Sequence, residues 1–247
     1  MLQSIFRNMP PVVKNLLIIN LIMFLATVAL QDLNLRTILS LHYPESSLFQ
    51  PYQFVTSIFM HGDFGHIFFN MFGLVMFGTV LEKVWGAKRM LIFFLACGIG
   101  ANVIYEVVQY IQIQNFLQEV ESDQVSDLIN LLNTEGADAV SKGYNYSAEK
   151  LGYINSLWNG GVLGASGAIF GILIAFAMLF PNTELMLIFL PVPIKAKYLI
   201  PIYVIIELFL GVQNFQWDNV AHFAHLGGAL IGFVFVKIWQ KDRTNFY

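Results

Sequence analysis

The 247-residue sequence has one cysteine and few charged residues. Because Cys97 stands alone, neither a disulfide framework nor a cysteine metal site is available. Only 12% of the residues are charged, and 13 basic residues face 16 acidic ones, so nothing in the charge balance favours binding to nucleic acid. The five histidines include no His-Glu-x-x-His segment. We therefore predict no metal, no other cofactor and no nucleic-acid partner.

What the sequence has in abundance is apolar side chains. Hydrophobic residues make up 57% of the chain, which includes 23 phenylalanines, and the mean hydropathy is +0.64. Apolar runs close to the length of a bilayer span recur along the chain, which is typical of an all-α integral membrane protein. We predict a single domain, residues 1–247, with a long acidic outer loop at 113–159. Its six transmembrane helices are predicted at about 12–30, 65–82, 90–112, 161–181, 198–213 and 220–239.

The basic residues predict the orientation of this bundle. With six spans, ten of the thirteen lysines and arginines fall on the side that carries both termini. Basic residues concentrate on the cytoplasmic side of membrane proteins. The sequence thus predicts a multi-pass protein with both termini cytoplasmic, and the cell (inner) membrane is the expected location.

The second, fourth and sixth predicted helices run in the same direction, so their N-terminal ends lie together. These ends carry the polar residues His66, Asn70, Ser166, His222 and His225. Ser166 and His225 each lie about five residues into their spans, which gives both a similar depth of about 8 Å. Polar groups inside a membrane are expensive and usually face a shared cavity. The topology alone therefore makes a serine–histidine pair plausible.

The chemistry of such a pair is that of acyl transfer. A serine hydroxyl needs a neighbouring base, and a histidine suits this role near neutral pH. The Asn70 amide, a His66 N–H and the Ser166 backbone N–H are candidate donors to the oxyanion. We predict a dyad without an orienting acid, because Glu207 lies on a different helix and has no assigned role. His222, one turn nearer the surface than His225, is predicted to line the cavity.

Four motifs carry a resemblance to a known family. They are His61-Gly62 with His66-Ile-Phe-Phe-Asn70, then Glu82 with Trp85-Gly86, then Gly164-Ala165-Ser166-Gly167, and Ala224-His225-Leu-Gly-Gly-Ala-Leu-Ile-Gly232. In this order the chain resembles rhomboid intramembrane serine proteases. The resemblance implies a six-helix rhomboid-like bundle, with Ser166 as nucleophile, His225 as general base, and His66, Asn70 and Ser166 stabilising the oxyanion. One departure is Pro51-Tyr52-Gln53, where many members have Trp-Arg.

The expected activity is that of a serine endopeptidase that cuts transmembrane segments near the outer face. Its expected partners are single-pass membrane proteins and the lipid bilayer; the oligomeric state is left open. The acidic loop is predicted to screen or orient substrates without taking part in catalysis. The alternative is a non-catalytic rhomboid-like factor for binding or quality control of membrane proteins. Such factors typically lack the serine or the histidine, and this chain has both.

Overall fold

The structure, a computed structural model, describes residues 8–187, 190–213 and 221–244, and in these ranges it is predominantly helical. The α-helices are α2 (Pro11–Ala29), α3 (Leu35–Leu39), α4 (Gln53–Thr56), α5 (Phe64–Gly73), α6 (Thr79–Trp85), α7 (Ala87–Leu117), α8 (Val125–Leu131), α9 (Ala137–Ser141), α10 (Glu149–Asn159), α11 (Ser166–Leu179), α12 (Ala196–Gln213) and α13 (His222–Thr244). Shorter helical turns are η1 (Gln31–Leu33), η2 (Ser57–Phe59), η3 (Leu74–Gly78) and η4 (Leu132–Gly136), and the strands are β1 (Glu184–Leu187) and β2 (Leu190–Lys195). The predicted start of the last span, residue 220, lies outside the described residues.

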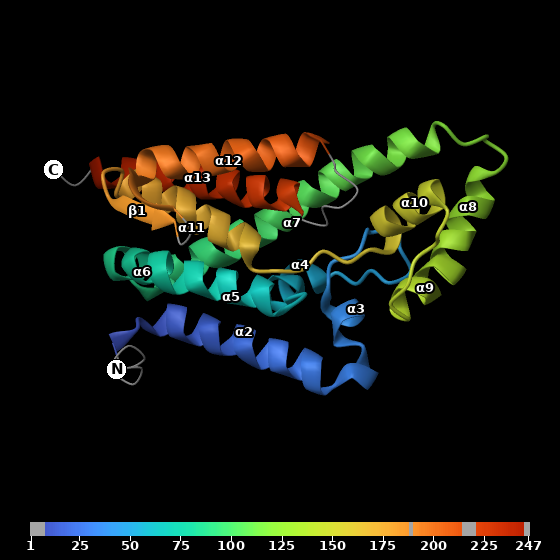
Figure 1. Cartoon of the computed structure of the whole chain (residues 1–247), viewed down its shortest axis with the longest axis horizontal. Coiled ribbons are helices and arrows are strands. Elements are labelled where there is room, and N and C mark those ends of the chain that lie inside the picture. Colours follow the sequence, from blue (N-terminus) through green and yellow to red (C-terminus); the bar gives the residue numbers. More distant parts are fainter. Residues whose placement is uncertain (1–7, 188–189, 214–220, 245–247) are drawn as a thin grey trace.

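The long helices form a bundle whose members lie side by side (Figure 1). Among the described residues, five helical stretches are long and apolar enough to cross a membrane: Pro11–Ala29, Phe64–Trp85, Ala87–Leu117, Ala196–Gln213 and His222–Gln240. The remaining apolar helix, α11, has 14 residues and measures about 21 Å, less than the roughly 30 Å of a bilayer core. The predicted all-α membrane bundle is confirmed. In the described part of the chain five helices have spanning length and α11 is shorter, so the predicted count of six spans is not matched in full.

Helix α11 begins later than predicted, and this changes the position of Ser166. The span was predicted from residue 161, whereas the helix starts at Ser166 itself. The preceding segment is not helical, because Val162 pairs with Leu41 in an isolated β-bridge. Gly164 adopts a φ of +133°, which side chains other than glycine rarely allow. Ser166 is therefore the first residue of its helix and does not lie one turn inside it.

Glycines allow α11 and α13 to approach each other closely. A Cβ atom at Gly228 would overlap the carbonyl oxygen of Gly167, and one at Gly232 would come within 2.7 Å of the Gly171 Cα. Small residues at such a crossing let two membrane helices pack backbone to backbone. The contact between these two glycine pairs fixes the start of α13 beside the start of α11.

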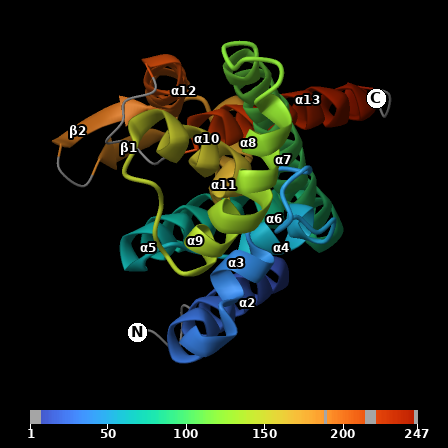
Figure 2. The same ribbon diagram turned by 90° about the vertical axis from the view of Figure 1, so that its right-hand side faces the viewer.

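The predicted acidic loop, 113–159, is largely helical. Helix α7 extends to Leu117, and α8, η4, α9 and α10 follow it. These short helices gather beyond one end of the bundle, and they face the viewer in Figure 2. They have a hydrophobic cluster of their own, here called the outer cluster, which consists of Tyr43, Ile113, Leu132, Ile154 and Trp158. The apolar side chains of an otherwise acidic segment thus build a small packed unit.

A two-stranded hairpin lies between α11 and α12. Strands β1 and β2 are antiparallel and pair Glu184 with Lys195. The hairpin lies at the end of the bundle that carries the start of α2 and the end of α13, opposite α8–α10 (Figure 1).

Candidate active site

Ser166 and His225 meet where α11 and α13 begin. In Figure 1, α5, α11 and α13 all start toward the end of the bundle that faces α10. The Nε2 atom of His225 lies 2.9 Å from the Ser166 hydroxyl oxygen, which is hydrogen-bonding distance. Ser166 is half-buried and His225 is buried. The two residues that the motifs single out are thus in direct contact on neighbouring helices.

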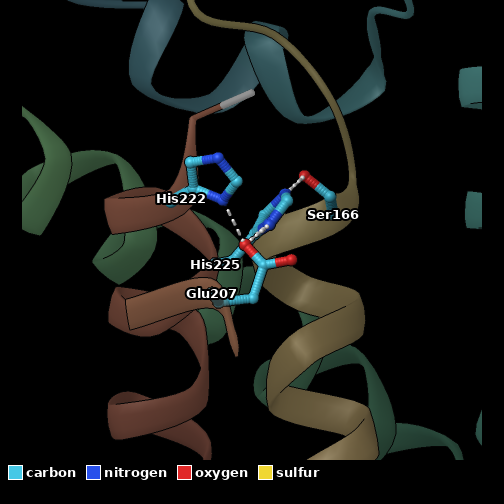
Figure 3. A network of polar contacts seen from close by, with 4 residues as sticks. All are labelled: Ser166, Glu207, His222 and His225. Atoms are coloured by element: carbon cyan, nitrogen blue, oxygen red, sulfur yellow. Dashed lines mark hydrogen bonds and ion pairs between the residues drawn. The ribbon is translucent and has the colours of Figure 1, made fainter. Parts of the chain in front are cut away.

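Glu207 of α12 is the third member of this arrangement (Figure 3). Its Oε2 atom lies 2.8 Å from the Nδ1 atom of His225 and 2.7 Å from the Nδ1 atom of His222. The side chain is only 6% exposed, so little water competes for these contacts. The expectation that no carboxylate orients His225 is wrong, because α12 and α13 bring Glu207 to the Nδ1 edge of the imidazole, while the Nε2 atom faces Ser166.

The imidazole of His225 is also held by packing. The ring of Phe170, one turn after Ser166 on α11, stacks on it with centroids 4.4 Å apart and planes inclined by 10°. Tyr203 of α12 packs against Phe170 in turn, with the two ring centroids 5.0 Å apart. With Nδ1 and Nε2 both engaged and one face covered, the ring has a single orientation.

Two of the three predicted oxyanion donors, His66 and Asn70, lie on the adjoining helix α5. Asp63 caps this helix by accepting a hydrogen bond from the His66 backbone N–H at 2.9 Å. A Cβ atom at Gly164 would lie 2.6 Å from His66 Nε2 and 3.5 Å from the Ser166 hydroxyl, so the imidazole and the serine border the same space. Asn70 is 5% exposed, and its Nδ2 atom has no hydrogen-bond partner among the described residues. An amide donor is thus buried on the same helix as His66, one turn further along.

Gln53, where many rhomboids have arginine, organises the loop before the site. It is fully buried, and its Nε2 donates to the carbonyls of Ile38 and Leu48 at 3.0 and 2.9 Å. Its Oε1 accepts from the backbone N–H groups of His42 and Gln50. The neutral amide therefore holds the loop through four hydrogen bonds to backbone groups.

The three ionisable side chains of the site can also be compared with a metal centre. Glu207, His222 and His225 each offer one ligand atom, and these atoms lie within 4.8 Å of one another. Their N···O separations of 2.7 and 2.8 Å are those of hydrogen bonds. The arrangement fits a carboxylate shared by two imidazoles without any ion between them.

A signal for Glu207 does exist in the sequence. A carboxylate inside an apolar span needs a partner, and Glu207 lies six residues before the end of α12 at Gln213. Helix α13 begins nine residues after Gln213, at His222. Two consecutive antiparallel helices with a short connection place these positions at similar depth. The spacing of α12 and α13 along the chain therefore places Glu207 at the depth of the two histidines, although it does not show that the side chains meet.

The fold and these contacts define a rhomboid-type membrane protein, with a serine and a histidine facing each other at the starts of two neighbouring helices. Comparison with known proteins agrees. The family model "Eukaryotic integral membrane protein (DUF1751)" matches residues 14–246. The curated relatives carry rhomboid names, and the chain belongs to the rhomboid family.

Three relatives illustrate the range of similarity. An uncharacterized mitochondrial rhomboid protein of Schizosaccharomyces pombe is 27% identical over 81% of this chain and 55% of its own length. The mitochondrial RHOMBOID-like protein 12 of Arabidopsis thaliana is 28% identical over 78% and 47%. The mitochondrial presenilin-associated rhomboid-like protein of Mus musculus is 31% identical over 49% and 36%. The chain thus spans about half or less of the length of these relatives.

These names correct the predicted location. The relatives are called mitochondrial, or chloroplastic in the case of the rhomboid-like protein 11 of Arabidopsis thaliana. The expectation of a cell (inner) membrane with cytoplasmic termini is therefore wrong. The distribution of basic residues distinguishes the two sides of a bilayer, but it carries no information about which membrane the bilayer belongs to. The multi-pass membrane character stands.

Proposed function

We propose that the protein is an intramembrane serine endopeptidase. The observation that carries the proposal is the continuous chain of contacts from Ser166 through His225 to Glu207. A serine in a packing role requires no imidazole on its hydroxyl and no carboxylate behind that imidazole. Nucleophile, base and orienting acid in this order form the constellation that activates serine in hydrolases on unrelated folds.

The first step is nucleophilic attack by Ser166 on a peptide carbonyl. Glu207 accepts the Nδ1–H hydrogen bond of His225, so Nε2 carries the lone pair that faces the serine hydroxyl. As the Ser166 oxygen bonds to the carbonyl carbon, its proton moves to Nε2, and Glu207 stabilises the imidazolium that forms. The same proton then passes to the leaving amine. A water molecule hydrolyses the acyl-enzyme by the same proton transfers.

The negative charge on the attacked carbonyl oxygen needs donors that are already in place. The first backbone N–H groups of α11 lack intrahelical acceptors and lie at the positive end of the helix dipole. Because Ser166 is the first residue of α11, its own N–H belongs to this set. The unsatisfied Asn70 Nδ2 and the His66 imidazole supply further donors in the proposed mechanism.

The proposed substrates are single-pass membrane proteins, cut near the bundle end that faces α8–α10. Helical segments shield their carbonyls by hydrogen bonding, so a segment must unwind before Ser166 can attack it. Sites with helix-breaking or small residues are therefore the expected targets. The names of the relatives favour an organelle membrane as the place where this happens.

Labelling with a fluorophosphonate, which reacts with activated serines, tests the proposal. The purified protein in detergent is expected to become labelled, while Ser166→Ala is not labelled and His225→Gln is labelled far more slowly. Ser156, on α10, provides the matched control, because Ser156→Ala should label like the wild type. If the folded wild-type protein gave no more labelling than Ser166→Ala, the non-catalytic alternative, a rhomboid-like binding or quality-control factor, would replace the protease.

A further inference from the structure

A second feature is separate from the serine–histidine contact and lies where α7 passes the loop that precedes α4. There the structure has a cavity of about 330 Å³ lined by Tyr43, Pro44, Glu45, Phe54, Val103, Glu106, Val107 and Tyr110. Neither Ser166 nor His225 lines it, so the proposed chemistry makes no use of this cavity.

The cavity contains a buried carboxylate in need of a partner. Glu106 is 7% exposed, and neither of its carboxylate oxygens has a hydrogen-bond partner among the described residues. An unpaired buried carboxylate is costly, and buried polar atoms are almost always satisfied by a donor. A donor from outside the chain would resolve this, and the cavity in front of Glu106 provides the room.

The depth of Glu106 indicates where such a donor comes from. Helix α7 has 31 residues and measures about 46 Å, longer than the roughly 30 Å hydrocarbon core. Counted from Ala87, beside the basic Lys88 and Arg89, about 20 residues cross the core. Glu106 therefore lies close to the far interface, at the level of the lipid headgroups. Tyr110, one turn further, is a residue type that is enriched at this level.

The walls of the cavity narrow the choice of ligand. Aromatic rings of Tyr43, Phe54 and Tyr110 suit a cation, as does the carboxylate of Glu45 beside them. On the same helix, Val107 and Ile111 are 55% and 51% exposed and provide an apolar track. A phospholipid whose headgroup ends in an ammonium group offers both a cation and an apolar tail at a membrane interface.

We propose that this cavity binds the headgroup of a phosphatidylethanolamine-type lipid. The primary ammonium group donates hydrogen bonds to both oxygens of Glu106, and the acyl chains lie along the exposed face of α7. Choline has the same charge but no N–H donor, whereas a primary ammonium has three, so only the ethanolamine headgroup satisfies the carboxylate. The bound lipid would fasten the loop around Tyr43 to α7. This inference does not depend on the proposed protease activity.

A competition experiment tests the headgroup directly. The delipidated protein in detergent is mixed with equal amounts of phosphatidylethanolamine and phosphatidylcholine that share the same acyl chains, and native mass spectrometry counts the adducts. The wild type is expected to prefer phosphatidylethanolamine about tenfold, roughly the effect of one charge-assisted hydrogen bond. Glu106→Gln should lower the ratio to near one, whereas Glu119→Gln, an exposed carboxylate just after α7, should leave it unchanged.

A second variant keeps the test decisive if Glu106→Gln fails to fold. Val107→Trp fills the cavity from its exposed side without disturbing the bundle core, and it should remove the ethanolamine adduct. Equal binding of the two lipids by the wild type would overturn the proposal. So would an ethanolamine preference that survives both Glu106→Gln and Val107→Trp.

Discussion

Glu207 offers one carboxylate oxygen, Oε2, to two histidines, and in the proposed mechanism it sets the tautomer of His225. In Glu207→Gln the amide can turn its NH₂ group toward Nδ1, which moves the ring proton to Nε2 and leaves no base for Ser166. We expect the rate of fluorophosphonate labelling to fall by roughly 10² to 10⁴, as when the acid of a serine triad is replaced by its amide.

The neighbouring histidine provides the control for this prediction. His222→Gln leaves the contact between Glu207 and His225 in place, so its labelling rate should fall by less than about tenfold. Thermal unfolding in detergent shows whether each variant is folded, and partial recovery of the rate in Glu207→Asp would support positioning by the carboxylate. A folded Glu207→Gln variant that labels within twofold of wild type would contradict this role.

His61 makes the stability of the protein depend on pH. It is 1% exposed, and its ring lies 5.1 Å from that of His66. Burial, followed by the proximity of His66, lowers the pKa of His61 from 6.5 to about 4. In the unfolded chain His61 therefore becomes protonated below about pH 6.5, whereas in the folded protein it stays neutral until the pH falls to about 4. Stability that is present above pH 6.5 is lost as the pH falls toward 4.

The size of this effect follows from the pKa difference. Between pH 7.5 and 5.0, the wild type should lose about 2 kcal/mol more of its unfolding free energy than His61→Gln, which has no titrating ring. Thermal or denaturant unfolding in detergent at the two pH values measures the difference. An identical loss in both proteins would show that His61 does not carry this dependence.

Sequence reasoning found most of the candidate site and missed its acid for a physical reason. Ser166, His225, His66 and Asn70 follow from motifs and from the shared direction of three helices. Glu207 belongs to no motif, and its role depends on how α12 and α13 lie relative to each other. Which side chains of two antiparallel helices meet is decided by their rotation about their axes, and hydropathy does not encode this rotation.

At the scale of single elements, Glu82 secures the start of α2. Its Oε1 and Oε2 accept hydrogen bonds from the backbone N–H groups of Val12 and Val13 at 2.9 and 2.8 Å. These are helix-start groups without intrahelical acceptors, and the carboxylate also complements the helix dipole. The motif residue at the end of α6 thus ties the first helix of the bundle to the second span.

Removing this carboxylate should destabilise the protein without affecting its chemistry. Two hydrogen bonds to a buried charged group suggest a loss of about 3 kcal/mol of unfolding free energy for Glu82→Ala. Unfolding in detergent measures the loss, and Lys83→Ala, at the exposed neighbouring position, should change little. Equal stability of the two variants would mean that water replaces the Glu82 carboxylate at no cost.

The sequence predicts those helices whose formation the bilayer requires, and it predicts the other elements less well. In the described part of the chain, each of the six predicted spans contains an apolar helix, because a span must satisfy its backbone internally. The start of α11 was not predictable from hydropathy, because residues 161–165 are apolar enough to continue the helix toward its N-terminus. What keeps them out of the helix is the bridge between Val162 and Leu41 and the positive φ of Gly164. Helices α9 and α10 were not predicted, because they contain few apolar residues and their many polar residues hide the helical hydrophobic pattern.

The whole molecule has distinct packed units. The bundle core joins α2, α5, α7 and α11 through buried side chains such as Leu16, Met71, Phe93 and Ile172. The outer cluster around Trp158 lies beyond the end of the bundle and shares with it the helix α7, through Ile113. Units with separate cores open separately when one of them is weakened. The acidic segment is therefore expected to loosen without unfolding the site.

Trp158→Ala tests this separation. The Trp158 side chain is 1% exposed, its ring lies 5.0 Å from that of Tyr43, and its Nε1 donates to Asn133 at 3.0 Å. Its removal should cost the outer cluster about 3 kcal/mol. We expect faster amide hydrogen exchange across residues 125–159, unchanged protection in α11 and α13, and Ser166 labelling within about threefold of wild type.

Ile172→Ala, in the bundle core, should instead speed exchange throughout the bundle. Loss of labelling in Trp158→Ala, with α11 and α13 still protected, would show that the acidic segment takes part in catalysis.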